Sequence, residues 1–387
     1  IYYVWTSNMS TPEMEAVQTT IEPKLAAFSD SIIQNTPLFL RIESVYNSPE
    51  KQNLSPEQQR LVWRYYTNYV LAGAKLDSIS KKRVAEINQL LAGLFTKFSQ
   101  HQLADEGDKF LELTSEKDLD GLPEGVKNAA AEAANAKNKK GSWIIANTRS
   151  SIEPFISYAN NRELREKAWR MFINRGDNGD ANDNNAIITE ILQLRAERAK
   201  ILGYPTHAHW RLADKMAQTP EKAMALLESV WPAAVQRVKE EVKDMQALAD
   251  KVGAKIKIEP WDYRYYAEKV RKSKFDLDQD EVKQYLQLEK LREGMFFVAG
   301  ELFNLEFTQV NDVPVFHPDV RVFKVTNKIS GQQIGLWYFD PYARKGKRSG
   351  AWMTAYRDQE KLNGNITTIV SNNCNFIKGK PGEPVLI

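Results

Sequence analysis

Four histidines are the side chains best suited to hold a metal or move a proton: His101, His207, His209 and His317. Only His207 and His209 lie close together. A spacing of two directs side chains to different faces of a helix, whereas ligands three or four apart converge on one ion. The sequence has no His-Glu-x-x-His pattern, the usual signature of a zinc-binding helix. We therefore interpret His207 and His209 as surface or capping residues near a helix start.

The other reactive groups are isolated. Cys374 is the single cysteine, which excludes an internal disulfide and a cysteine-based zinc site, and no partner signal marks it as a nucleophile. The run from Asp177 to Asp183 resembles a calcium loop but lacks the glutamate at its twelfth position, so it indicates a capped helix start. His317 precedes a proline in a predicted loop between strands. It could contact a substrate or bond the backbone, and both interpretations stay open.

Composition bounds the class of protein. The 387 residues carry 53 basic and 50 acidic side chains, a net charge of +3, and 42% hydrophobic residues. No like-charged block indicates a nucleic-acid partner, and no apolar run approaches the length of a membrane span. The N-terminal residues do not form a signal peptide. A bacterial protein of the cytoplasm, slightly preferred, or of the periplasm fits one cysteine.

Helical patterns dominate up to residue 305. Cap residues followed by proline start helices at Thr11 and Ser55, and a third helix starts at Ser78 or Ser80. Residues 291–302 are strongly apolar, which predicts a buried helix. A small β insert is expected within 106–146, where two short strand candidates, 110–113 and 143–146, flank an alanine-rich helix.

Strand patterns follow. Runs rich in aromatic and β-branched residues begin at Gly335, Ser349 and Ile366, separated by glycine, proline and charge. They predict a minor sheet near 307–376. The fold class is therefore mainly α, in the all-α class, with a small sheet near the C-terminal end. We divide the chain into a helical body, 1–305, and a β-containing region, 306–387.

Four segments in order carry a family resemblance: 202–220 (Leu-Gly-Tyr-Pro-Thr through Thr-Pro), 315–323 (Val-Phe-His-Pro-Asp-Val-Arg-Val-Phe), 349–353 (Ser-Gly-Ala-Trp-Met) and 373–386 (Asn-Cys-Asn-Phe through Pro-Val-Leu). Together they resemble the thimet-oligopeptidase-like zinc metallopeptidases, peptidase family M3, in the bacterial peptidyl-dipeptidase (dipeptidyl carboxypeptidase) branch. The resemblance covers essentially the whole chain and implies a mostly helical, zincin-type hydrolase with a deep channel and a small sheet beside the zinc.

The resemblance also implies where the chemistry lies. Family members hold zinc on a His-Glu-x-x-His helix and a later glutamate, and that helix is expected shortly beyond Ile387. We therefore expect a fragment whose parent releases C-terminal dipeptides, while this chain alone holds no zinc or other cofactor and no catalytic residue. The expected substrates are short peptides.

In such peptidases the strand around Gly-Ala-Trp runs beside an extended substrate. The matching positions, Ser349, Gly350 and Ala351, are the predicted substrate-binding residues, with His317 as a further candidate; equally, Gly350 could merely turn the chain. Apolar surface near Leu336, Trp352 and Phe376 is expected to be exposed and covered by the missing C-terminal part or by self-association. The alternatives are an oligoendopeptidase of the same family and a non-catalytic helical peptide-binding module or pseudo-enzyme.

Overall fold

The computed structural model describes residues 2–277, 279–362, 364–378, 382 and 384–387. Contacts between Cα atoms divide the chain into two compact units. Unit 1 comprises Ile1–Ser10, Leu103–Arg175 and Glu240–Ile387, and unit 2 comprises Thr11–Gln102 and Gly176–Lys239. The division at 305/306 proposed from the sequence follows the change from helix to strand along the chain. As a boundary between independently folding parts it stays a proposal.

Unit 2 is built on helices whose starts follow local capping rules. Its elements are α2 (Pro12–Ile33), α3 (Thr36–Asn47), the 3₁₀ helix η1 (Pro49–Asn53), α4 (Pro56–Leu71), most of α5 (Ser78–Asp108), α9 (Asn185–Ile201), α10 (His207–Leu212) and the first part of α11 (Pro220–Lys251). The Thr11 hydroxyl accepts the Met14 N–H at 3.3 Å, and Ser55 forms a capping box with Gln58. These two predicted starts are confirmed.

The third predicted start is also confirmed, and the structure identifies its cap. Asp77 Oδ1 accepts the backbone N–H groups of Ile79 at 2.9 Å and Ser80 at 3.0 Å, so α5 begins at Ser78. The buried side of α5 packs on α9 through a cluster formed by Ile87, Leu91, Ile187, Ile191 and Leu194. This packing closes one core of unit 2.

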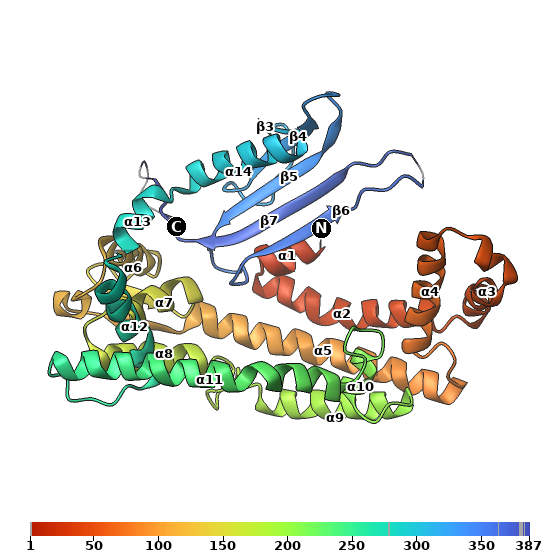
Figure 1. Cartoon of the computed structure of the whole chain (residues 1–387), viewed down its shortest axis with the longest axis horizontal. Helices are drawn as coiled ribbons and strands as arrows, with labels where there is room; N and C mark the ends of the chain where they lie inside the picture. Colours follow the sequence, from red (N-terminus) through yellow and green to blue (C-terminus); the bar gives the residue numbers. More distant parts are fainter. Residues whose placement is uncertain (1, 278, 363, 379–381, 383) are drawn as a thin grey trace. The chain divides into compact units, whose positions relative to one another are not determined.

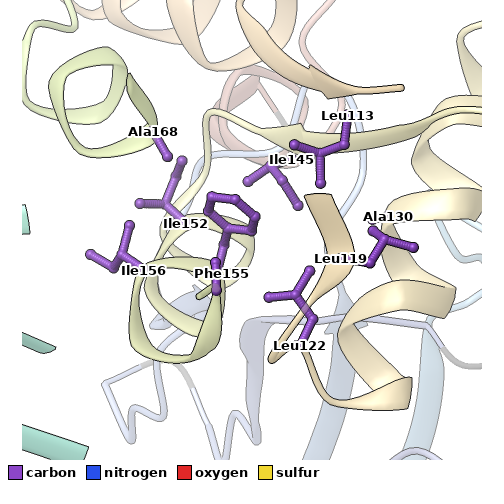
Figure 2. Packing of buried hydrophobic residues seen from close by; sticks show 10 residues of the cluster. Leu113, Leu119, Leu122, Ala130, Ile145, Ile152, Phe155, Ile156 and Ala168 are labelled. Atoms are coloured by element: carbon purple, nitrogen blue, oxygen red, sulfur yellow. The ribbon is translucent and has the colours of Figure 1, made fainter. Parts of the chain in front are cut away.

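Unit 1 contains the predicted β insert. Strands β1 (Phe110–Leu113) and β2 (Trp143–Ala146) pair antiparallel, and α6 (Glu124–Ala136) lies between them in sequence. Around them lie the 3₁₀ helix η2 (Glu116–Leu119), α7 (Arg149–Tyr158), α8 (Arg162–Ile173) and α12 (Pro260–Phe275). Figure 2 shows Phe155 between side chains of α7 and the insert, at the centre of a core that includes Leu113, Ile145 and Ile152.

The second sheet of unit 1 is the predicted C-terminal one. Its strands are β3 (Leu305–Val310), β4 (Arg321–Asn327), β5 (Gln333–Tyr342), β6 (Trp352–Arg357) and β7 (Thr368–Phe376), in the order β3-β4-β5-β7-β6. Only β5 and β7 pair in parallel among these described strands; the other neighbours are antiparallel. The mainly α prediction with a minor sheet is confirmed, although two sheets make the all-α label too narrow.

Helix α14 (Leu288–Phe303) follows α13 (Gln279–Tyr285) and covers one face of the sheet (Figure 1). The core beneath it contains Leu288, Phe323, Val325, Trp337 and Phe339. The prediction that residues 291–302 are buried is wrong. Several large apolar side chains of this helix are exposed, because only one stripe of a helix can face one sheet: Leu291, Met295, Phe297, Val298 and Leu302.

Exposed apolar surface was predicted near Leu336, Trp352 and Phe376, and the structure has it beside two of these residues rather than on them. All three side chains are half-buried, because strands pack on both sides of Leu336 and because Phe376 joins the core under α14. The apolar side chains that directly follow two of them are exposed, namely Met353 on edge strand β6 and Ile377 after β7. Among the described helices, none has a stretch both long and apolar enough to cross a membrane.

Candidate functional site

Strand β6 forms one edge of the sheet in unit 1. It pairs antiparallel with β7 and has no strand on its other side among the described residues. Its side chains alternate: Trp352, Thr354 and Tyr356 are half-buried, whereas Met353 and Ala355 are exposed. An edge of this kind offers backbone groups to a further strand. Figure 1 shows β6 beside β7 at the margin of the sheet.

The predicted substrate-binding residues directly precede this strand. The strand predicted at 349–353 begins only at Trp352, because Gly350 has a left-handed φ of 96° that interrupts extended backbone. The Asn375 side chain donates from Nδ2 to the carbonyl oxygens of Gly350 at 2.6 Å and Arg348 at 2.9 Å. Glycine is thus required here by backbone conformation, and no heavy atom lies within 4 Å of where a Cβ would stand.

Ser349, the first residue of this segment, is bonded to a different part of unit 1. Its hydroxyl donates to Glu106 Oε1 at 3.1 Å, and Glu106 also pairs with Arg175. Burial raises the pKa of Glu106, although the charge of Arg175 and the bond from Ser349 partly offset it. Ala351, by contrast, is exposed. The segment 349–351 therefore has an anchored start and an open end at the sheet edge.

A buried ionic network lies under the loop that leads into β6. Arg344 donates to both oxygens of Asp340, at 2.7 and 2.8 Å, and Lys347 Nζ lies 3.0 Å from Oδ1. Asn8 Nδ2 donates to Asp340 Oδ2 at 2.8 Å and to Asn373 Oδ1 at 2.7 Å. Lys347 also donates to the carbonyl oxygens of Asp340 and Tyr342. We call Asp340, Arg344, Lys347, Asn8 and Asn373 the buried cluster.

Burial and the neighbouring charges shift the pKa values of Asp340 and Lys347 in opposite directions. Burial alone raises the pKa of Asp340, but the bonds from Arg344, the charge of Lys347 and the bond from Asn8 outweigh it, so the pKa lies below its ordinary value. Burial lowers the pKa of Lys347, and Asp340 offsets only part of that effect. A buried carboxylate with several charge-assisted partners fixes the geometry of the elements that supply them.

Those elements include the first residues of the chain. After α1 (Tyr2–Asn8), the Ser10 N–H donates to the Gly346 carbonyl at 2.8 Å, and the Arg348 N–H donates to the Ser7 carbonyl at 2.9 Å. A Cβ on Gly346 would stand 2.2 Å from the Ser10 oxygen, so only glycine allows this approach. The segment 2–10 therefore fastens the loop that precedes β6.

His317 occupies a turn ahead of β4. Its Nδ1 accepts the Asp319 N–H at 3.2 Å, which places the ring proton on Nε2 when the imidazole is neutral. Burial and the charge of Arg344 lower the pKa of His317, with Asp319 acting in the opposite direction. In the described part of the chain no hydrogen bond or ion pair joins His317 to residues 349–351. Its predicted substrate contact stays a proposal.

Sequence reasoning missed the buried cluster entirely. Asp340, Arg344 and Lys347 lie within eight consecutive positions, and a charged residue inside an aromatic strand pattern was the available signal. Asn8 gave no signal, because 332 positions separate it from Asp340. In the structure these residues lie under the loop that precedes β6. They therefore support the predicted site from behind.

The described residues do not fit a zinc ion. Within them, no three histidine, cysteine or acidic side chains converge into a group that could hold a metal. His209 instead contacts its helix cap, with Nδ1 2.8 Å from Thr206 Oγ1, and Asp183 accepts the Asn185 N–H at 2.8 Å beside the start of α9. These contacts confirm the capping interpretation of both segments.

Comparison with known proteins decides the family. The family model described as "Peptidase family M3" matches residues 155–387. The chain belongs to peptidase family M3. It is 35% identical over its full length to the dipeptidyl carboxypeptidase of Escherichia coli strain K12, of which it covers 57%. The M3 chain thus spans a little over half the length of that relative.

Other M3 relatives carry a different name. The chain is 37% identical to organellar oligopeptidase A of Arabidopsis thaliana, over 89% of the chain and 44% of that protein. It is 31% identical to oligopeptidase A of Haemophilus influenzae, over 97% of the chain and 56% of that protein. The resemblance drawn from the four segments is therefore confirmed at the level of the family.

Proposed function

We propose that this chain supplies the peptide-binding sheet edge of a zinc-dependent peptidyl-dipeptidase, an enzyme that releases dipeptides from the C-termini of oligopeptides. The match along the whole chain to a dipeptidyl carboxypeptidase carries this proposal. The open edge of β6 supports it, because an extended peptide can add to such an edge through backbone hydrogen bonds and so bind with little regard to its sequence.

In this proposal the segment 349–351 and β6 receive the peptide backbone. Gly350 turns the chain without side-chain bulk, Ala351 leaves the approach open, and Ser349 is fastened to Glu106. The exposed side chains of Met353 and Ala355 would flank alternate residues of the peptide. His317 would contribute from the turn ahead of β4, with Nε2 as its available donor.

The zinc ligands and the general base are proposed to lie outside these 387 residues. When bound, zinc activates a water molecule in peptidases of this type. Since the described residues do not fit the ion, the chain by itself should bind peptide without cleaving it. Its proposed partners are therefore a short peptide and the remaining part of the catalytic region.

An oligopeptidase that cleaves within peptides is the second candidate. It is favoured by the relatives named oligopeptidase A, one of which is 37% identical. The two candidates differ in their products. A peptidyl-dipeptidase releases dipeptides in turn from the C-terminus, whereas an oligopeptidase releases fragments of varied length, and mass spectrometry of the digest of a nine-residue peptide separates them.

The experiment compares the chain alone with the chain supplied with the C-terminal part that the resemblance predicts, joined or added separately. We expect stoichiometric zinc and cleavage of a blocked tripeptide only in the second preparation, with release of the C-terminal dipeptide. Tightly bound zinc with turnover in the chain alone would overturn the assignment of the ligands. Absence of any peptidase activity in the completed protein would overturn the enzymatic proposal and favour a non-catalytic peptide-binding module.

A further inference from the structure

Unit 2 contains a pocket of about 400 Å³, and all of its lining residues belong to this unit. Leu71 and Ala72 line it from the end of α4, and Trp210 lines it from α10. The indole N–H of Trp210 donates to the Leu71 carbonyl at 2.8 Å, which fixes the aromatic wall against α4. The volume is that of a site for a small molecule.

The rim of this pocket carries more positive than negative charge. Arg64, Arg211 and Lys215 line it together with one carboxylate, Asp214. Arg64 lies 2.6 Å from Asp214 Oδ2, and Lys215 Nζ lies 2.8 Å from Oδ1. Each oxygen of Asp214 is thus already engaged. We call these four residues the open cluster.

Donors remain available in the open cluster. Within the described residues, Arg211 makes no hydrogen bond or ion pair; its guanidinium lies 5.4 Å from the centre of the Trp210 ring. Arg64 uses one terminal nitrogen for Asp214 and for Asn68. An arginine has five N–H donors and an ammonium has three, so two carboxylate oxygens cannot satisfy this set.

Further cations near Trp210 add to the positive electrostatic potential at the pocket. Arg198 lies beneath Trp210, 4.7 Å from the ring centre. Burial, followed by the charges of Arg195 and Arg211, lowers the pKa of Arg198 to about 10, and Asp30 offsets part of this effect. Burial and the same three arginines lower the pKa of His207. The nearby cations therefore repel one another.

We propose that this pocket binds a small oxyanion, a carboxylate or phosphate carried on an apolar body, between Arg211, Arg64 and Lys215. The oxyanion accepts from the free donors of Arg211 and from the donors of Arg64 and Lys215 that face away from Asp214. The apolar body rests on Leu71 and the Trp210 ring. The site lies wholly within unit 2 and does not depend on the proposed peptidase function.

Two substitutions test this proposal, because they should change the affinity for the anion in opposite directions. Asp214 competes with an incoming anion for Arg64 and Lys215, so Asp214→Asn should bind the anion more tightly. Arg211→Gln removes donors that only the ligand uses, so it should bind more weakly. A purely structural role for these residues predicts no gain in affinity from the loss of a carboxylate.

The measurement is calorimetric titration of the full chain with benzoate, with phenyl phosphate and with neutral phenol. Partly exposed charged contacts correspond to a change of about threefold to tenfold in Kd for each variant. The expected result is binding of an anion but not of phenol, weakened by Arg211→Gln, strengthened by Asp214→Asn and unchanged by Arg60→Gln. Arg60 is a matched control because it lies on the same helix, α4, over the ring of Trp63 and outside the pocket lining.

The two anions distinguish the class of ligand. A preference for benzoate assigns a carboxylate, and a preference for phenyl phosphate assigns a phosphate. Equal binding of phenol and the anions would overturn the proposal, as would equal weakening by Arg60→Gln and Arg211→Gln. Circular dichroism confirms folding of each variant, and Arg211→Gln alone decides the matter if Asp214→Asn does not fold.

Discussion

Two aspartates in this chain each lie between an arginine and a lysine, yet their surroundings differ. In the buried cluster, the side chains of Asp340, Arg344 and Lys347 are 0%, 13% and 0% exposed. In the open cluster, Asp214 is 8% exposed, whereas its partners Arg64 and Lys215 are 41% and 51% exposed. The same three residue types therefore form one cluster that is buried and one that is partly exposed beside a pocket.

The difference lies in how many donors find acceptors. Around Asp340, backbone carbonyls accept the hydrogen bonds that Arg344 and Lys347 do not give to the carboxylate, and the Asn8 amide donates to that carboxylate. These partners come from distant parts of unit 1. Around Asp214 the donors outnumber the acceptors. A saturated buried network fixes structure, and a cluster with donors to spare can accept a ligand.

Replacement of the central aspartate should separate the two clusters most strongly. Asp340→Asn leaves buried Arg344 and Lys347 without their carboxylate and should reduce the free energy of unfolding by about 3–5 kcal/mol. Asp214→Asn removes ion pairs whose cations are about half exposed, and should cost less than about 1 kcal/mol. Urea denaturation of the two variants measures both values, and equal losses would contradict the distinction.

Glycine substitutions test how tightly the loop before β6 is fastened. Gly346→Ala adds a Cβ 2.2 Å from the Ser10 carbonyl oxygen at a φ of 77°, and we expect a loss of about 2–4 kcal/mol from clash and strain together. Gly350→Ala has the same type of backbone strain but open space, so we expect about 1–2 kcal/mol. Thermal denaturation provides the comparison. A larger effect at Gly350 would show that the fastening of residues 2–10 to this loop is not tight.

An asparagine accompanies each cluster, which allows a matched pair. Asn8→Ala removes the bond to Asn373 Oδ1 and one of the two bonds to Asp340 Oδ2, which keeps that from Arg344, and should cost about 1–3 kcal/mol. Asn68 accepts from Arg64 at 3.4 Å beside the pocket, and Asn68→Ala should change stability by no more than about 0.5 kcal/mol. Denaturation curves of both variants decide this. A cost at Asn68 equal to that at Asn8 would mean that the amide in the buried cluster has no special role.

The pH dependence of stability provides a further test of the buried cluster. Because the folded-state pKa of Asp340 is lowered, its stabilising contribution is present above the ordinary aspartate pKa, about 3.9, and is lost as the pH falls through the folded value. The stability difference between the native chain and Asp340→Asn should therefore shrink as the pH falls below about 4. Denaturant titrations at a series of pH values measure it; a constant difference down to pH 2 would contradict an ionised Asp340 in the native chain.

Local signals in the sequence were sufficient for much of the fold. Cap residues such as Thr11 and Ser55 determine helix starts through atoms three positions away, so their effects can be predicted without tertiary contacts. Burial of residues 291–302 was predicted wrongly, because apolar content does not say what covers a helix. The start of β6 was placed three residues early, since the conformation of Gly350 depends on Asn375 in another strand.

The candidate site shows the same division. The segment 349–351 could be proposed from its residues and from the family resemblance. The buried cluster behind it could not, because Asn8 and Asp340 are 332 positions apart, and a charged residue inside an aromatic strand does not identify its distant partner. The open cluster likewise required the structure, since its cations come from α4 and from the segment that follows Trp210.

The central claim is that the edge of β6 receives an extended peptide, and hydrogen–deuterium exchange of the chain with and without an excess of an N-acetylated hexapeptide tests it most directly. Backbone hydrogen bonds to the peptide should slow exchange at residues 348–357 and leave β4, which already has a strand on each side, unchanged. Unchanged exchange at β6, with the peptide shown to be bound by calorimetry, would contradict the claim.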